Sequence, residues 1–230
     1  MLFDPLYLLV LGVGLVLSLV AQGWVKTRVN RWGQVGTRRG LTGRDVAEAI
    51  LRAEGIHDVR VEPVGGLLSD HYSPSERVLR LSRDIYHGRS IAAAGIAAHE
   101  VGHAIQHKRR YWPMQLRQTM VPIANVGTNL GVWLVVLGMV IGVAQLATLG
   151  VILFGGFVAF TLVTLPVEFD ASNRAKKVLL ANGIVTPQEA QGVGQVLTAA
   201  AATYLAAAVA ALLQLAYWAL RAGVLGGRDD

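Results

Sequence analysis

Fifty consecutive residues without a charged side chain, at positions 118–167, limit the fold of this chain more than any other feature. A helix needs about 20 apolar residues to cross a hydrocarbon core of roughly 30 Å, so a single span cannot use the whole run. Two spans joined by a tight turn near residues 145–150 can use it. The sequence therefore predicts a transmembrane hairpin that returns the chain to the side of the membrane it left.

Two more uncharged stretches, at 6–25 and 196–220, are expected to be membrane helices. No basic residues precede the first, and no small-residue cleavage site follows it before Trp24, which is typical of an uncleaved anchor rather than a signal peptide. The second is rich in alanine, which is only weakly hydrophobic, so packing against protein is the alternative to spanning. With 53% apolar residues and a mean hydropathy of +0.46, the composition favours a mainly α integral membrane protein with about four transmembrane helices.

The basic residues indicate an orientation in the membrane. Of the 21 lysines and arginines, sixteen lie between Lys26 and Arg117, and three more lie at 174–177. If the spans alternate, these residues share one side, which the positive-inside rule makes cytoplasmic, with both termini outside. The net charge of +6 is not gathered in one run, so a membrane explains it better than nucleic acid does, and no nucleic-acid partner is expected.

The polar segment at 26–117 has the patterns of a small α+β subdomain. Apolar residues near helical spacing predict a helix over 41–56, with Thr42 as its N-cap and Gly55 at its end. Alternating sequences predict short strands at 59–64 and 77–82, with a turn-rich segment between them. A second helix is expected to begin at Ser90 and to end in a basic turn.

That second helix carries the sequence His-Glu-x-x-His. His99 and His103 are four residues apart, so their imidazoles lie one turn apart on one face and can reach a single ion at about 2.0–2.1 Å. Glu100 is placed to take a proton from a water that the ion activates. This is the zincin signature. The alternative, three polar residues on an exposed face, fits poorly with apolar flanks that would bury the helix, because a buried polar group needs a partner.

A catalytic zinc site needs a third protein ligand. His107 is too far along the helix for one ion to meet all three histidines, and the position six after His103 is Arg109. Since the chain has no cysteine, Glu168 is the best candidate: it directly follows the uncharged run and is expected to emerge on the same side as His99. The alternative is a juxtamembrane carboxylate paired with Arg174 or a lysine.

Other polar residues suggest roles around such a centre. His71 or Tyr72 could stabilise an oxyanion from across the cleft, although a turn with ordinary surface residues is the alternative. The strand at 78–81 could be an edge that receives a peptide by β-addition, or simply a strand of the subdomain.

The chain resembles the YugP-like family of bacterial membrane zinc metallopeptidases. The resemblance lies in several motifs along most of the chain: GLTGRDVAEAIL, DVRVEPVGGLLSDHYSP, RVLRLSRDIYHGRSIAAAGIAAHEVGHAIQH, VPIANVGTNL, LPVEFDASNRA and LTAAAATYLAAAVAALLQL. It implies a gluzincin-type site with one zinc ion, bound by His99 and His103, with Glu100 as base. It also implies Glu168 as the third ligand, as in the distantly similar HtpX-like membrane proteases.

The chain departs from that pattern at one point. Many gluzincins place an aspartate four residues after the third ligand, where it orients a ligating histidine. Here that position is Ser172, and Asp170 lies two residues after Glu168 instead. The partner that orients each histidine is therefore left open.

Five segments follow from these patterns. They are a transmembrane anchor at 1–25, a zincin-like α+β subdomain with the HExxH helix at 26–117, a transmembrane hairpin at 118–167, the third-ligand helix and loop at 168–195, and a C-terminal helix expected to span at 196–230.

The leading hypothesis is a zinc metalloendopeptidase of the bacterial plasma membrane, with its active site facing the cytoplasm and peptides or membrane proteins as substrates. Nothing in the sequence sets an oligomeric state. An intramembrane protease of the site-2 type is one alternative, but its Asn-Pro-Asp-Gly motif is absent. A non-catalytic, zinc-stabilised scaffold is another, and the intact Glu100 argues against it, because a structural site needs ligands but no base.

Overall fold

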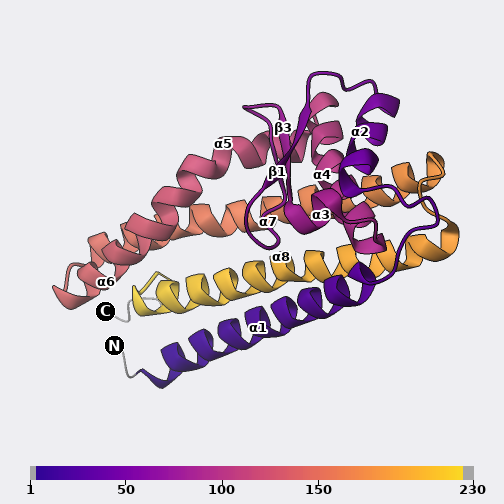
Figure 1. Ribbon diagram of the computed structural model, residues 1–230. Helices are drawn as coiled ribbons and strands as arrows, with labels where there is room; N and C mark the ends of the chain where they lie inside the picture. Colours follow the sequence, from indigo (N-terminus) through magenta and orange to yellow (C-terminus); the bar gives the residue numbers. More distant parts are fainter. Residues whose placement is uncertain (1–3, 225–230) are drawn as a thin grey trace. The chain divides into compact units, whose positions relative to one another are not determined.

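The computed structural model describes residues 4–224 and is mainly helical (Figure 1). Within this range, four helical stretches are long and apolar enough to cross a membrane, as expected: Pro5–Gly33, Trp112–Val140, Ala144–Ala181 and Pro187–Arg221. The elements in chain order are α1 (Pro5–Gly33), α2 (Gly43–Ala53), β1 (Arg60–Val64), β2 (His71–Ser73), β3 (Val78–Ser82), α3 (Arg83–His87), α4 (Ile91–Lys108), α5 (Trp112–Val126), the π-helix η1 (Gly127–Gly131), α6 (Val132–Val140), α7 (Ala144–Ala181) and α8 (Pro187–Arg221).

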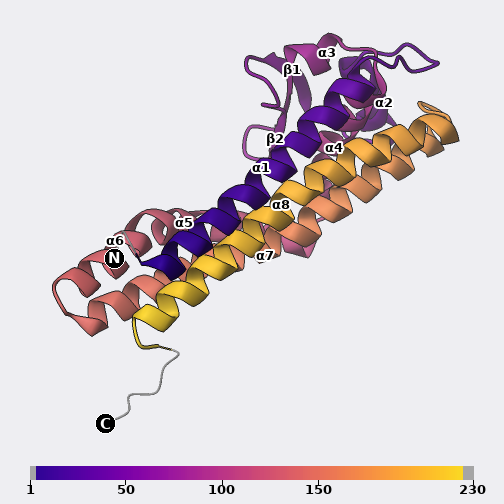
Figure 2. The same ribbon diagram turned by 90° about the horizontal axis from the view of Figure 1, so that it is seen from below.

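The chain divides into two compact units, and α1, α7 and α8 each contribute to both. Of the described residues, the first unit holds 4–21, 115–166 and 203–224, and the second holds 22–114 and 167–202. In the first unit, α1 and α8 lie side by side in Figure 1 and in Figure 2, and Gly14 of α1 faces the side chain of Ala210.

The hairpin of the first unit turns earlier than expected. Helix α6 ends at Val140 and α7 begins at Ala144, so the turn is at 141–143 and not near 145–150. Gly142 makes this turn with φ +75, a left-handed conformation that glycine adopts at little cost. Gly150 instead lies where two helices meet: a Cβ atom there would stand 2.5 Å from the backbone nitrogen of Val135. Small residues of this kind let membrane helices approach closely.

The second unit contains a three-stranded sheet with the order β1-β3-β2. The two expected strands, β1 and β3, pair in parallel, and β2 adds to β3 in antiparallel orientation. The interpretation of β3 as an edge strand is therefore wrong, because both of its sides are hydrogen-bonded. Strand β2 was expected to be part of a turn-rich segment; its three residues are too few to show an alternating pattern.

The helices of the second unit begin where the capping residues predict. Thr42 accepts a hydrogen bond from the backbone of Asp45, whose carboxylate binds the Thr42 backbone in return, and this capping box starts α2. Ser90 caps α4 by a single hydrogen bond, which its side chain accepts from the backbone N–H of Ala93. Most of α4 is buried, and it packs with α2, β3 and the second part of α7 around one core that includes Ile50, Leu79, Leu81, Ile105 and Leu179.

Candidate metal centre

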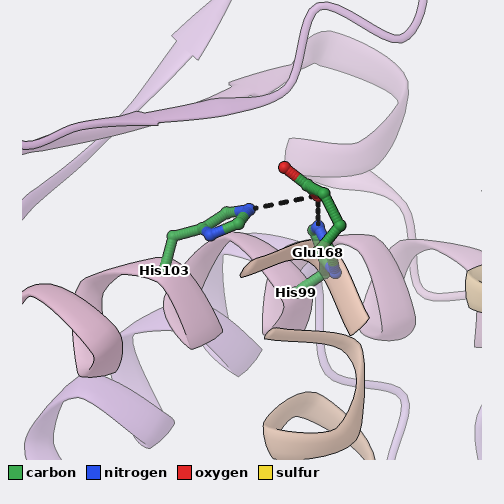
Figure 3. A group of neighbouring side chains, drawn as sticks. All are labelled: His99, His103 and Glu168. Atoms are coloured by element: carbon green, nitrogen blue, oxygen red, sulfur yellow. Dashed lines mark hydrogen bonds and ion pairs between the residues drawn. The ribbon is translucent and has the colours of Figure 1, made fainter. Parts of the chain in front are cut away.

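The three expected metal ligands converge within the second unit. Helix α4 presents His99 and His103 side by side, with ring centroids 4.8 Å apart and ring planes at 85°. Glu168 reaches them from α7, and Figure 3 shows its carboxylate pointing at both imidazoles. One oxygen, Oε2, lies 3.2 Å from Nε2 of His99 and 3.5 Å from Nε2 of His103.

This arrangement fits a zinc ion. One ligand atom from each of the three side chains can be chosen so that all lie within 4.8 Å of one another. Tetrahedral zinc with bonds near 2.0–2.2 Å separates neighbouring ligand atoms by about 3.3–3.6 Å, close to the two nitrogen–oxygen distances here. Two imidazoles and a carboxylate are also the ligand set of many catalytic zinc sites, which leave one position open.

The glycine of the His-Glu-x-x-His motif allows helices α4 and α7 to approach closely. Gly102 lies between Glu100 and His103 along the chain, and a Cβ atom there would stand 2.7 Å from the carbonyl oxygen of Ala171 on α7. A real Cβ would not tolerate that contact, so a larger residue would push the helices apart. The close approach of α4 and α7 is what lets a glutamate side chain reach both histidines.

Further polar groups hold the outer nitrogens of the two imidazoles. Ser172 Oγ is 3.2 Å from Nδ1 of His99, so the residue at the position that the family pattern gives to aspartate does contact a ligand candidate. Nδ1 of His103 is 2.9 Å from Oε1 of Gln106. Gln106 was not identified from the sequence, although a lone glutamine three residues after His103 in an apolar helix was a usable signal.

Glu100 follows His99 on α4 and is not one of the three candidate ligands. Its side chain is buried, and burial raises the pKa of its carboxyl above the ordinary value, more than the neighbouring histidines lower it. A buried carboxylate with a raised pKa is a stronger base than an exposed one. Burial alone would lower the pKa of His103, but Glu168, Glu100 and the hydrogen bond to Gln106 together outweigh this effect and leave the pKa raised.

The two candidates for oxyanion stabilisation have different surroundings. His71 is exposed, and its Nδ1 lies 2.8 Å from the carbonyl oxygen of Ser69. Tyr72 is half-buried, and its hydroxyl lies 2.8 Å from Nδ1 of His107, one turn beyond His103 on α4. Asp70, just before them, anchors the segment by accepting hydrogen bonds from the backbone and hydroxyl of Ser82.

Comparison with known proteins gives consistent similarities. Residues 7–223 match the protein family described as "Putative neutral zinc metallopeptidase". The chain is 44% identical over 230 residues to the "Putative membrane protease YugP" of Bacillus subtilis (strain 168), and the match covers 100% of each chain. No solved structure matches the chain.

Proposed function

The chain belongs to the family described as "Putative neutral zinc metallopeptidase", and from this premise we propose that it is a membrane-embedded zinc-dependent endopeptidase. The observation that carries the proposal is the convergence of His99, His103 and Glu168 next to the buried carboxylate of Glu100. Three ligands from two helices, with a base that is not a ligand, are what peptide hydrolysis at a zinc site requires.

The chemistry divides between the ion and the side chains. Zinc bound by His99, His103 and Glu168 would supply a Lewis acid that polarises a carbonyl group and lowers the pKa of water toward about 7. Glu100 takes a proton from the attacking water while the oxygen of that water forms a bond to the scissile carbonyl carbon. The same carboxyl then delivers that proton to the amine that leaves when the carbon–nitrogen bond breaks. We place Tyr72 or His71 as the hydrogen-bond donor to the developing oxyanion.

The proposed location follows from the helices and the charges. Four membrane-length helices support a multi-pass protein of the bacterial plasma membrane. The basic residues concentrated at 26–117 support a cytoplasmic position for the candidate centre by the positive-inside rule. Substrates would then be peptides or membrane proteins with segments accessible from the cytoplasm.

The deciding experiment compares Glu100→Gln with the wild type for both zinc content and cleavage. The purified protein in detergent is loaded with zinc and incubated with an unstructured protein such as casein. We expect the variant to keep its zinc and to lose activity by about 10²–10⁴-fold, because the amide cannot accept the proton. Glu48→Gln on α2, a half-buried residue in helix-surface ion pairs with Arg44 and Arg52, is the matched control and should cleave normally. Normal cleavage by a folded, zinc-loaded Glu100→Gln protein would refute the mechanism.

A further inference from the structure

Gln106 is fully buried, with 0% of its surface exposed, and both ends of its amide make hydrogen bonds. Its Nε2 donates to the carbonyl oxygen of Val167 at 2.8 Å and to Oδ2 of Asp170 at 2.8 Å. Both partners are on α7, so this one side chain of α4 bonds to the helix that carries Glu168. A buried amide with all these partners in place has a fixed orientation.

The two acceptors decide which way the amide faces. If the amide were rotated by half a turn, Oε1 would lie against the carbonyl oxygen of Val167 and the carboxylate of Asp170, with no proton between them. The flipped amide would lose both of its donated hydrogen bonds and place its oxygen against two acceptors, so the observed orientation is strongly preferred. Oε1 must therefore face the imidazole of His103.

An oxygen at this place selects one form of the imidazole. Because Oε1 can only accept a hydrogen bond, Nδ1 of His103 must carry the proton that it donates across the 2.9 Å contact. In the neutral ring, Nε2 then holds the free electron pair, and Nε2 is the atom that faces Glu168 at 3.5 Å. His99 differs, because its Nδ1 meets the hydroxyl of Ser172, which can donate or accept.

The contact chain continues outward to a charged pair. Asp170 also accepts a hydrogen bond from Nε of Arg174 at 2.5 Å, and the Arg174 guanidinium lies over the ring of Tyr111, 5.6 Å from its centroid. The same carboxylate oxygen, Oδ2, therefore accepts from both the Gln106 amide and the Arg174 guanidinium. His103, Gln106, Asp170 and Arg174 thus form one connected set of polar groups.

We propose that Gln106 is a positioning residue of the metal centre, which holds His103 in the tautomer and ring orientation that bind zinc through Nε2. The proposal rests on the proposed function insofar as the metal is zinc. In this chain a neutral amide, itself oriented by Asp170, takes the place at His103 that a carboxylate often has beside a zinc-bound histidine. Asp170 acts through Gln106 and has no direct contact with His103 among the hydrogen bonds of residues 4–224.

The test is the zinc affinity of Gln106→Leu in the full-length protein, measured by competition with a chromogenic chelator. We expect affinity to fall by about 10–100-fold, the usual effect of removing a group that orients a metal ligand. Gln195→Leu is the matched control: Gln195 accepts hydrogen bonds from Arg28 and Trp32 in the same unit but contacts none of the ligands. Its affinity should stay within about threefold of wild type, even if its melting temperature falls.

The outcomes separate the two proposals. Wild-type affinity in a folded Gln106→Leu protein would overturn the role of Gln106 and leave the proposed function intact. A wild type that binds no zinc would overturn the proposed function, and the role of Gln106 with it. If Gln106→Leu does not fold, NMR of zinc-loaded wild type with ¹⁵N-labelled histidine decides. Zinc on Nε2 and a slowly exchanging proton on Nδ1 of His103 are expected, and zinc on Nδ1 would overturn the proposal.

Discussion

Gly102 on α4 lies directly against Ala171 on α7, so closely that a Cβ atom on Gly102 would stand 2.7 Å from the Ala171 carbonyl oxygen. We therefore expect Gly102→Ala to separate the two helices and to move Glu168 away from the histidines. Overpacking of this kind costs about 1–3 kcal/mol of folding stability. Zinc affinity should fall at least tenfold, because a misplacement of about 1 Å is enough to disturb a metal site. Melting temperature and chelator competition on the same protein measure both effects.

The matched control for this change is Gly194→Ala on α8. An added Cβ at Gly194 would meet nothing nearer than the Lys176 side chain at 4.0 Å, an ordinary contact. Alanine is the better helix former by about 1 kcal/mol, so this variant should be as stable as wild type or more stable, with unchanged zinc affinity. Equal zinc affinity in Gly102→Ala and Gly194→Ala would show that the close approach does not position the site.

Glu168 should be as necessary for metal binding as the two histidines. Zinc content measured by atomic emission should be close to one ion per chain in the wild type and should be lost in Glu168→Ala, since two imidazoles alone form an incomplete site. Glu76→Ala is the control, because Glu76 is an exposed carboxylate in an ion pair with Arg80. A Glu168→Ala protein that retains full zinc would assign the third ligand elsewhere.

Features set by local sequence were predictable. The start of α2 at Thr42 and of α4 at Ser90 depends on capping residues and on apolar spacing within a few positions. The meeting of Glu168 with His99 was expected from a simple count, since two spans return the chain to its starting side. Capping residues, apolar spacing and the length of a membrane span were sufficient to predict these helix starts and this meeting of side chains.

Features set by distant contacts were not predictable. The central place of β3 depends on pairing with both β1 and β2, which no local pattern encodes. Glycine is common in turns, but Gly150 lies where α7 packs closely against Val135 of α6. Only the position of the neighbouring helix shows this. Gln106 was missed for the same reason, because its role comes from the Val167 carbonyl and Asp170, about sixty residues away in the chain.

The capping box of α2 should make part of the folding stability depend on pH. Hydrogen bonds from the side chain and then the backbone of Thr42 hold the pKa of Asp45 below its ordinary value of 3.8. A carboxyl whose pKa is lower in the folded state contributes stability above its unfolded pKa, and this contribution is lost as pH falls through the lower folded pKa. Thr42→Ala should cost about 1 kcal/mol near neutral pH and progressively less as the pH falls below the ordinary Asp pKa of 3.8.

Thermal unfolding at a series of pH values measures this effect. Thr198→Ala on α8 is a suitable control, since Thr198 is an exposed residue within a helix and caps nothing. It should change stability by no more than about 0.5 kcal/mol, with no added pH dependence. A Thr42→Ala penalty that stays constant as the pH falls from 7 to well below 3.8 would mean that the Asp45 carboxylate is not the group involved.

Tyr72 and His71 can be separated by their effects on the rate. If the Tyr72 hydroxyl donates to the oxyanion, Tyr72→Phe should lower kcat by about 10²–10³-fold with little change in KM, because that interaction forms only in the transition state. His107 contacts the same hydroxyl at 2.8 Å, so His107→Ala should show a smaller fall in kcat through loss of orientation. His71→Ala tests the alternative donor, since His71 is exposed and its Nδ1 contacts a backbone carbonyl two residues away. A full rate in Tyr72→Phe together with a large loss in His71→Ala would identify His71 as the hydrogen-bond donor to the oxyanion. Full rates in both variants would show that neither side chain of strand β2 takes part in catalysis.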